Sequence, residues 1–357
     1  MWRWNLKRSY FISVVLAVQL LVLAGKPVHS QTTEPPRVHL LATGGTIAGG
    51  TTGPLQGDDL IRLIPELAQV ATLTVEDFSN IGSSRMTPEL QFQLAQRVNS
   101  LFDQEPNLAG IVITHGTDSL EETAFFLDLL LSSERPVVFA AAQRPPRMKA
   151  SDGPRNLLNA IRLAASPSSR GMGVLVTLND EIHAAREVRK THSIALNAFR
   201  SPWVGPIGIV DEGEIYIFRR PLRRLTLEAK HVEPRVDLIT LVAGSDGHLI
   251  RAAVAAEAKG IVVETFGRGN VPPKVAEAIK EAREKDVTVV FTTRTRGGRV
   301  VLGESEQQLG IVSGQDLDGF KARILLVTAL GETSDLKTIQ SYFDLLSGIV
   351  GTSAGSN

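Results

Sequence analysis

The stretch Arg37-Val-His-Leu-Leu-Ala-Thr-Gly-Gly-Thr-Ile-Ala48 begins as a compact apolar run and ends as a glycine-rich loop. Such a run is typical of a buried strand. The segment Ala109-Gly-Ile-Val-Ile-Thr114 repeats this pattern and continues into His115-Gly-Thr-Asp118. Ligands of open α/β sheets bind beyond the carboxyl ends of the strands. We therefore expect Thr46 and Thr117, which follow two such strands, to face one pocket.

Strand and helix patterns alternate along the rest of the chain, which predicts parallel sheets with covered faces. The predicted strands are 37–43, 72–78, 109–114, 136–141 and 173–178, followed by 237–242, 260–265, 287–293 and 322–328. The predicted helices are 87–103, 118–132 and one from Pro154, followed by 248–258, 272–285 and 335–347. The clearest helix start is Thr87-Pro88, because threonine is a good N-cap and proline suits the first helical position.

The alternation pauses between Pro221 and Pro234, where the chain is polar and rich in arginine. We interpret 223–236 as a linker and the arginines at 219–224 as a solvated face. The expected fold class is α/β, with two α/β domains of mainly parallel sheets. The larger N-terminal domain is expected at 37–222 and the smaller C-terminal domain at 237–350. Residues 31–36 are expected to form a short linker and 351–357 a flexible tail.

The first 30 residues have the pattern of a signal peptide. A basic segment, Arg3–Arg8, precedes the apolar run Phe11–Ala24, and the small residues Val28 and Ser30 suit cleavage before Gln31. The alternative is an uncleaved anchor, but the run is short beside the ~20 apolar residues that a span needs. We therefore expect export to the periplasm or the medium, with no stable membrane partner after cleavage.

Composition argues against several classes of protein. The chain carries 38 basic and 38 acidic residues, and its first 30 residues contain bases but no acid, so the remainder is mildly acidic. Such a body offers no broad basic surface for nucleic acid. The absence of cysteine excludes disulfides and thiolate chemistry. No two of the seven histidines have H-x-x-x-H spacing, so no metal site is expected.

The glycine loop does not match the known phosphate-binding patterns. The G-x-G-x-x-G fingerprint is absent, and Thr51 stands where a P-loop has lysine. Glycine lets the backbone approach a substrate closely and present N–H groups to an oxyanion, and a nearby hydroxyl suits a nucleophile. Thr46 is therefore a candidate nucleophile. The alternative is a tight turn between strand and helix with no chemical role.

Thr117 and Asp118 stand at a predicted helix start, where either residue could act simply as an N-cap. A threonine nucleophile is weak, however, and needs a base. A Thr–Asp–Lys relay would supply one if a neutral lysine takes the proton and the aspartate orients it. We interpret His115, in the same segment, as structural.

Four motifs together resemble the bacterial L-asparaginases: Thr43-Gly-Gly-Thr-Ile-Ala48, His115-Gly-Thr-Asp118, Glu121-Glu-Thr-Ala124 and Ala150-Ser-Asp-Gly-Pro154. The resemblance extends from about residue 37 to 345. It implies hydrolysis of L-asparagine to L-aspartate and ammonia through an acyl-enzyme, with no cofactor. It also implies a homotetramer, a dimer of close dimers, with each active site between N- and C-terminal domains of neighbouring subunits.

The resemblance also implies roles for single residues. Thr46 is similar to the acylated nucleophile of the family. Thr117, Asp118 and Lys190, the last from Val188-Arg-Lys-Thr191, resemble its second Thr–Asp–Lys cluster.

Ser83, Ser84, Thr117, Asp118 and Ala142 are the candidates for substrate binding. Ser83 resembles the residue that binds the substrate α-carboxylate, and Asp118 resembles the partner of the α-ammonium. Ala142 resembles the residue whose carbonyl orients the amide. Because a zwitterion needs an anion and polar donors placed apart, this division makes physical sense.

The chain departs from the family pattern at the lid. Thr51–Gly57 is short and lacks the usual tyrosine, since the only tyrosines are Tyr10, Tyr216 and Tyr342.

Two further departures concern the binding residues. Ser84 stands where many exported members have glutamine, as in the cytoplasmic type. The asparagine that a neighbouring subunit supplies in the exported type has no counterpart near Ala243–Asp246, and its glutamate would be Glu304 or Glu306.

Three other functions fit parts of the same pattern. One is a glutaminase-asparaginase or an amidase for another small amide. Another is a catalytically weakened amino-acid-binding protein, suggested by the missing lid tyrosine. A third is an ammonia-supplying subunit of a tRNA amidotransferase, against which the signal peptide argues. We expect asparagine to be preferred over glutamine, because the short lid leaves less chain to close over a substrate.

Overall fold

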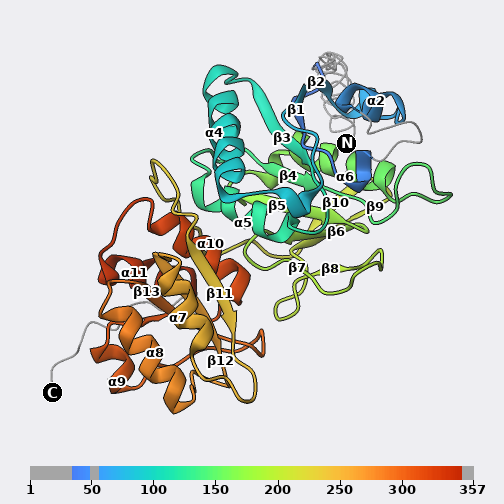
Figure 1. The fold of residues 1–357 in the computed structure, drawn as a ribbon. Coiled ribbons are helices and arrows are strands. Elements are labelled where there is room, and N and C mark those ends of the chain that lie inside the picture. The colour runs from blue at the N-terminus through green and yellow to red at the C-terminus, as the bar shows by residue number, and fades with distance from the viewer. Residues whose placement is uncertain (1–33, 49–55, 348–357) are drawn as a thin grey trace, which may run out of the picture. The chain divides into compact units, whose positions relative to one another are not determined.

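The computed structural model describes residues 34–48 and 56–347 (Figure 1). The predicted signal peptide, the first half of the short linker after it, most of the lid and the predicted tail lie outside these ranges. The described residues from Pro36 onward belong to one compact unit. Within the described ranges, no helix has both the length and the apolar character that a bilayer span requires.

The larger sheet of the described chain has eight strands in the order β10-β9-β6-β5-β4-β3-β1-β2. Five are parallel: β1 (Arg37–Ala42), β2 (Thr72–Asp77), β3 (Leu108–Thr114), β4 (Val137–Ala140) and β5 (Val174–Leu178). The others, β6 (Glu181–Ala184), β9 (Gly208–Asp211) and β10 (Glu214–Ile217), extend the sheet in antiparallel fashion. The chain leaves β1 for β2 on one side and returns to β3 on the other. The switch point of the sheet, where α/β proteins bind ligands, therefore lies between β1 and β3.

Helices cover both faces of this sheet, because alternate residues of its strands are apolar on either side. On one face, Leu41 packs in a core with α4 (Pro88–Gln104) and α5 (Leu120–Leu130). On the other face, Leu40 packs in a core with α2 (Gly57–Arg62) and α6 (Gly153–Ala165). The short helix α3 (Leu67–Val70) contributes Leu67 to this second core. Thr87 caps α4 as predicted, since its hydroxyl accepts the Leu90 N–H at 3.3 Å.

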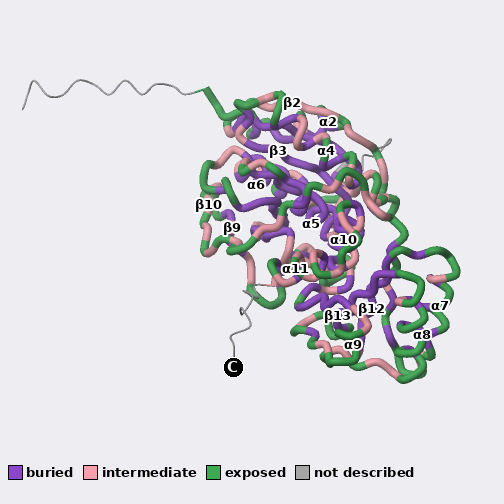
Figure 2. Tube along the Cα trace, turned by 90° about the vertical axis from the view of Figure 1, so that its left-hand side faces the viewer, coloured by how far each residue is buried: buried purple, intermediate pink, exposed green. Residues whose placement is uncertain are grey.

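The smaller sheet has four described strands, all parallel and in chain order: β11 (Val236–Thr240), β12 (Gly260–Thr265), β13 (Thr288–Thr293) and β14 (Val312–Ser313). One face is covered by α7 (His248–Ala255) and α8 (Pro273–Arg283), and the other by α10 (Gly319–Ala329) and α11 (Leu336–Ser347). The short helix α9 (Glu304–Gln308) precedes β14. Figure 2 shows β12 and β13 buried and much of α7 and α8 exposed. These two sheets confirm the predicted α/β class.

One predicted strand is wrong. Residues 322–328 are part of helix α10, not a strand. This helix packs against α5 on one side and against the smaller sheet on the other, so its residues are buried almost all round. A helix buried on every side shows no amphipathic period, and its short apolar run cannot be told from a buried strand by pattern alone.

The interpretation of 219–224 as a solvated face is also wrong in part. Arg219 donates to both carboxylate oxygens of Glu187, at 3.1 and 2.6 Å. Arg224 lies 3.6 Å from Asp128, whose pKa is raised by burial and lowered again in part by that guanidinium. The segment after β10 is therefore held against the larger sheet and its helices by ion pairs.

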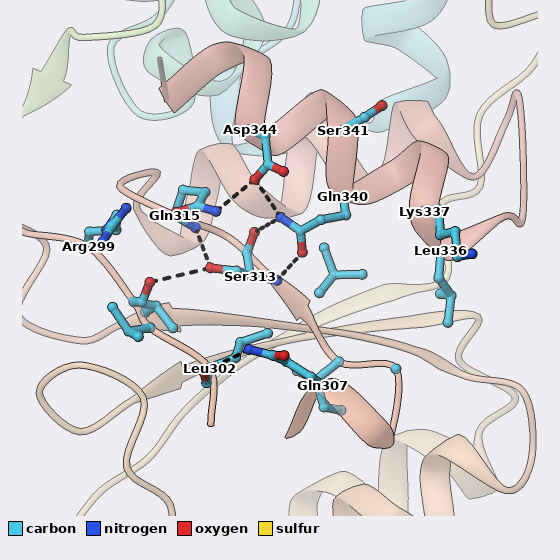
Figure 3. A pocket seen from close by; sticks show the side chains of 15 residues that line it. Arg299, Leu302, Gln307, Ser313, Gln315, Leu336, Lys337, Gln340, Ser341 and Asp344 are labelled. Carbon is cyan, nitrogen blue, oxygen red and sulfur yellow. Dashed lines mark hydrogen bonds between the residues drawn. The ribbon is translucent and has the colours of Figure 1, made fainter. Parts of the chain in front are cut away.

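A groove of about 530 Å³ lies beside β14, the outer strand of the smaller sheet (Figure 3). The side-chain amide of Gln340, from α11, accepts from the Ser313 N–H at 2.7 Å and donates to the Ser313 carbonyl at 3.2 Å. Asp344 accepts from the amides of Gln340 and Gln315 at 2.8 and 2.7 Å. These side chains satisfy main-chain groups that an edge strand would otherwise leave unpaired.

Candidate active site

The loops that follow β1 and β3 lie in direct contact. The Thr43 hydroxyl donates to the Thr114 carbonyl at 2.7 Å, and the Thr43 N–H donates to the same carbonyl at 3.2 Å. Gly45 then adopts φ +87° and lies so close to Gly116 that a Cβ atom on Gly45 would collide with its backbone. Glycine is required here both for the backbone angle and for the close approach.

The loop that follows β2 completes this close packing. A Cβ atom on Gly116 would lie 2.5 Å from the Ser83 hydroxyl oxygen. The same hydroxyl accepts the Asp118 N–H at 3.0 Å, and the Ser83 carbonyl accepts the Ser119 hydroxyl at 2.6 Å. Ser83 is buried in η2 (Ser83–Arg85), whereas Ser84 is exposed. Loops that follow three neighbouring strands therefore meet at the switch point of the sheet.

Lys190 reaches this point from a separate element. It lies in β7 (Arg189–Lys190), which pairs with β8 (Phe199–Arg200). Its Nζ donates to Thr117 Oγ1 at 2.9 Å and to Asp118 Oδ1 at 3.2 Å. Thr117 is buried, whereas the Asp118 side chain is 65% exposed and open to a ligand. The three residues of the expected Thr–Asp–Lys cluster are thus in hydrogen-bonding contact.

Thr46 is the first residue of η1 (Thr46–Ala48) and is half-buried. It follows Gly45, whose contact with Gly116 places the chain at Thr46 beside the chain that leads to Thr117. Ile47 is buried and packs near Gly153, where a Cβ atom would lie 3.3 Å from the Ile47 side chain. The candidate nucleophile is thus fixed by a strand on one side and a buried apolar residue on the other.

Ala142 is fully buried two residues beyond β4. The loop after it is held by Asp152, whose carboxylate accepts the N–H groups of Gln143 and Arg144 at 3.0 and 2.8 Å. A Cβ atom on Gly153 would lie 3.5 Å from that of Ala142 and 3.3 Å from Ile47, so Ala142 is near the Thr46 loop. Ala142 therefore belongs to the same edge of the sheet as the threonines.

His115 is fully buried and contacts the Phe139 ring edge-on, with 5.7 Å between ring centres. Its Nδ1 lies 2.7 Å from the Gly116 carbonyl. Burial lowers its pKa to about 4, so the ring is neutral at pH 7. These contacts agree with a structural role, since they support the turn that precedes Thr117.

Sequence reasoning missed one contact of the site. Glu121, at the start of α5, accepts the Lys190 N–H at 3.1 Å through its buried carboxylate. Burial raises the pKa of this carboxyl group. Its motif, Glu121-Glu-Thr-Ala124, is recognisable in the sequence, but no local pattern shows that it contacts a residue 69 positions away. Among residues 34–48 and 56–347, no three His, Asp or Glu side chains are grouped as metal ligands would be.

Known proteins share both halves of this architecture. The family model for "Asparaginase, N-terminal" matches residues 37–223, and the model for "Glutaminase/Asparaginase C-terminal domain" matches residues 235–343. "L-asparaginase 2" of Bacillus subtilis is 37% identical over 88% of both chains. "Glutaminase-asparaginase" of Pseudomonas fluorescens is 37% identical over 93% of this chain and 97% of its own.

A periplasmic relative and a solved structure extend the comparison. "Probable L-asparaginase periplasmic" of Haemophilus influenzae is 37% identical over 87% of this chain and 93% of its own. The crystal structure titled as a probable cytoplasmic L-asparaginase from Campylobacter jejuni superposes with a TM-score of 0.81 and 37% identity, over 86% of this chain and 98% of its own. Since the two family models together span nearly all of the described residues, the chain belongs to the bacterial asparaginase family.

Proposed function

We propose that the protein hydrolyses L-asparagine to L-aspartate and ammonia through an acyl-enzyme on Thr46. The observation that carries the proposal is the contact of Lys190 Nζ with Thr117 Oγ1 at 2.9 Å, on the loop adjoining the one that bears Thr46. A lysine that touches a buried threonine hydroxyl at the switch point of an α/β sheet is an arrangement suited to proton transfer.

The chemistry follows from which groups can move protons. Thr46 Oγ1 attacks the side-chain amide carbon, and its proton passes to the Thr117–Lys190 pair, whose lysine must be neutral to accept it. The tetrahedral intermediate carries its negative charge on the former carbonyl oxygen, which main-chain N–H groups of the glycine loop are suited to stabilise. Breaking the C–N bond releases ammonia once the nitrogen regains a proton. Water then attacks the ester and regenerates Thr46.

Substrate binding is assigned to polar groups around this centre. The exposed carboxylate of Asp118 would pair with the substrate α-ammonium. The hydroxyls of Ser83 and Ser84 would donate to the α-carboxylate of the substrate, and the carbonyl of Ala142 would orient the nitrogen of the substrate's side-chain amide. Ser83 already accepts the Asp118 N–H, so the two binding groups are held relative to each other before a substrate arrives.

L-glutamine is the second candidate substrate. Relatives of similar identity are named glutaminase-asparaginase as well as L-asparaginase, which favours activity toward both amides. Glutamine is one methylene longer than asparagine, and such a difference changes the free energy of binding by only ~1–3 kcal/mol. We propose that asparagine is preferred, with a lower kcat/KM for glutamine.

Assembly and location complete the proposal. We propose a homotetramer in which a neighbouring subunit contributes Glu304 or Glu306, both in α9, to each site. We also propose export, with the first 30 residues removed, in keeping with a relative named as periplasmic. A fully active monomer, found by light scattering, would contradict the homotetramer. Full-length protein retained in the membrane, identified by N-terminal sequencing, would contradict removal of the first 30 residues.

The decisive experiment separates an enzyme from a binding protein. Ammonia release by the purified mature protein is measured with L-asparagine, with L-glutamine and with buffer alone, and aspartate binding is measured by calorimetry. Thr117→Val should lower kcat while aspartate binding stays within about tenfold, because the hydroxyl acts mainly in the transition state. Asp118→Ala should lose binding as well, since it removes the partner of the α-ammonium. If the wild type binds aspartate but releases no ammonia, the protein is a binder.

A further inference from the structure

Charged residues that the proposed reaction does not use surround the segment that bears Lys190. The ammonium of Lys321, in α10 of the C-terminal part of the chain, donates to the main-chain carbonyl of Val188. The guanidinium of Arg189 lies 3.3 Å from Asp318 Oδ2. Both contacts tie the start of α10 to β7 and to the residue just before it.

The same segment is held from the N-terminal part by Glu121, which accepts the Lys190 N–H at 3.1 Å. Asp318 is also the N-cap of α10, since its Oδ1 accepts the Lys321 N–H at 3.1 Å. One carboxylate therefore fixes the start of the helix and binds the residue beside Lys190. We call Lys321, Asp318 and Glu121 the β7 clamp.

Lys321 is an unusual member of this clamp because it is 1% exposed. Burying an ammonium costs several kcal/mol unless hydrogen bonds and opposite charges compensate. Burial lowers the pKa of Lys321, and the carboxylates of Asp318 and Glu121 oppose that effect. A methionine of similar length would fill the space without this cost, so stability alone does not explain a lysine here.

The contact geometry gives Lys321 a specific role. Val188 and Lys190 flank Arg189, and the clamp binds a carbonyl on one side and an N–H on the other. These two hydrogen bonds fix the main chain from which the Lys190 side chain extends to Thr117. A displacement of about 1 Å in a catalytic group can cost ~10²-fold in rate.

We propose that Lys321 is a positioning residue for Lys190: by holding the Val188 carbonyl, it sets where Lys190 Nζ lies relative to Thr117 Oγ1. The proton-transfer geometry in the N-terminal part of the chain then depends on the first turn of α10. This inference rests on the proposed function for the role of Lys190 in catalysis, but the position of Lys190 can be measured separately.

The first test compares Lys321→Met with Arg186→Gln. Arg186 also joins the two parts of the chain, through Asp316 at 2.7 and 2.9 Å, but makes no hydrogen bond to residues 188–190. Lys321→Met should lower kcat by about 10–100-fold and leave KM within about threefold. Arg186→Gln should keep kcat within about twofold, whatever its effect on melting temperature.

The second test asks whether Lys321 acts through Lys190. In a Lys190→Ala background, measured in single turnovers, adding Lys321→Met should change the residual rate by less than about twofold. If Lys321→Met merely reduced the amount of folded protein, it would lower the rate by the same factor in the wild-type and the Lys190→Ala backgrounds. An equal reduction in the two backgrounds would therefore overturn the proposal.

The third test measures how accessible the Lys190 side chain is, and it does not depend on enzymatic activity. Brief acetylation followed by mass spectrometry gives the labelling rate of Lys190, with exposed Lys274 as an internal standard. Lys321→Met should raise the Lys190 rate by roughly threefold or more, because loosening β7 frees the Lys190 side chain from Thr117 and makes its amine accessible to the reagent. Arg186→Gln should leave that rate unchanged. An unchanged rate in Lys321→Met overturns the positioning role, whereas a wild type without ammonia release overturns only the proposed function.

Discussion

Lys190 Nζ lies 2.9 Å from Thr117 Oγ1, although 73 positions separate the two residues in the chain. Thr117 comes from the loop after the central strand β3, and Lys190 comes from the small two-stranded sheet formed by β7 and β8. The contact therefore depends on the tertiary fold and joins two elements that no main-chain ladder connects. It holds an amine and a hydroxyl within hydrogen-bonding distance, which is the geometry that the proposed proton transfer requires.

Removing either partner of this contact should slow the reaction to a similar extent. We expect Thr117→Val and Lys190→Met each to reduce kcat by ~10²-fold or more, because general acid–base catalysis usually contributes a factor of that size to the rate. The double variant should be little slower than the poorer single variant, because the two groups act as one unit. Steady-state ammonia release measures all three. Reductions that multiply would mean that the residues act independently.

The close approach of Gly45 to Gly116 predicts a difference between two glycine substitutions. Gly45→Ala places a side chain against the backbone of Gly116 at φ +87° and should both destabilise the protein and displace Thr46. Gly171→Ala has a similar strain, φ +72°, but a Cβ atom there meets nothing within 4 Å. We expect a cost of about 1–2 kcal/mol for Gly171→Ala and a larger cost for Gly45→Ala.

Activity then distinguishes these two variants further. Gly45→Ala should lose at least ~10²-fold in kcat, because a small displacement of the nucleophile is costly. Gly171→Ala should retain the wild-type kcat while its melting temperature falls. If the two variants had the same kcat, the contact between the glycine loops would have no part in placing Thr46.

Much of the fold could be predicted from the sequence because its strands are apolar runs with clear ends. The parallel strands β1 to β5 and β11 to β13 lie within a few residues of their predicted positions, whereas the two-residue strand β14 was not predicted. Helix α10 was missed because it is apolar on every side, which removes the period that marks a helix. The antiparallel strands β6, β9 and β10 were missed because charged residues such as Glu181, Asp211 and Glu214 interrupt their short apolar runs, whereas the equally short β4 is apolar throughout.

Some residues of the site could be predicted from the sequence and others could not. Position after a strand pointed to Thr46 and Thr117, because loops at the carboxyl end of a sheet meet at its switch point. Lys190 could be proposed only from the family resemblance, since nothing in its local sequence indicates the Thr117 contact. The contacts of Glu121 and Lys321 depend on packing between distant helices and β7, and no local pattern carries that information.

The buried ring of His115 predicts a pH effect on stability. Its pKa is about 4 in the folded protein, against 6.5 for an ordinary histidine such as that of the unfolded chain. Between pH 4 and pH 6.5 the unfolded chain therefore binds more protons than the folded one. Stability should therefore fall as pH decreases from 6.5 toward 4, by at most about 1.4 kcal/mol per pH unit from this residue. The melting temperatures of wild type and His115→Gln, compared from pH 7 to pH 5, should converge. A gap that stays constant with pH would contradict the assignment.

The amide of Gln340 predicts a local contribution to stability at the edge of the smaller sheet. Gln340→Ala leaves both main-chain groups of Ser313 without their partner and should cost about 1–3 kcal/mol. Gln307→Ala removes one exposed hydrogen bond to the Leu302 carbonyl in the same groove and should cost about 0.5 kcal/mol or less. Thermal unfolding of both variants tests this. Equal costs would show that the pairing with Ser313 adds nothing.

Ammonia release from L-asparagine by wild type and Thr46→Val tests most directly whether Thr46 is the nucleophile of an asparagine hydrolase. Losing a nucleophile should cost at least as much as losing an acid or base, which is ~10²–10⁴-fold. We predict clear release by the wild type, and a rate at least ~10²-fold lower for Thr46→Val with unchanged aspartate binding. A Thr46→Val variant that releases ammonia at the wild-type rate would contradict the account.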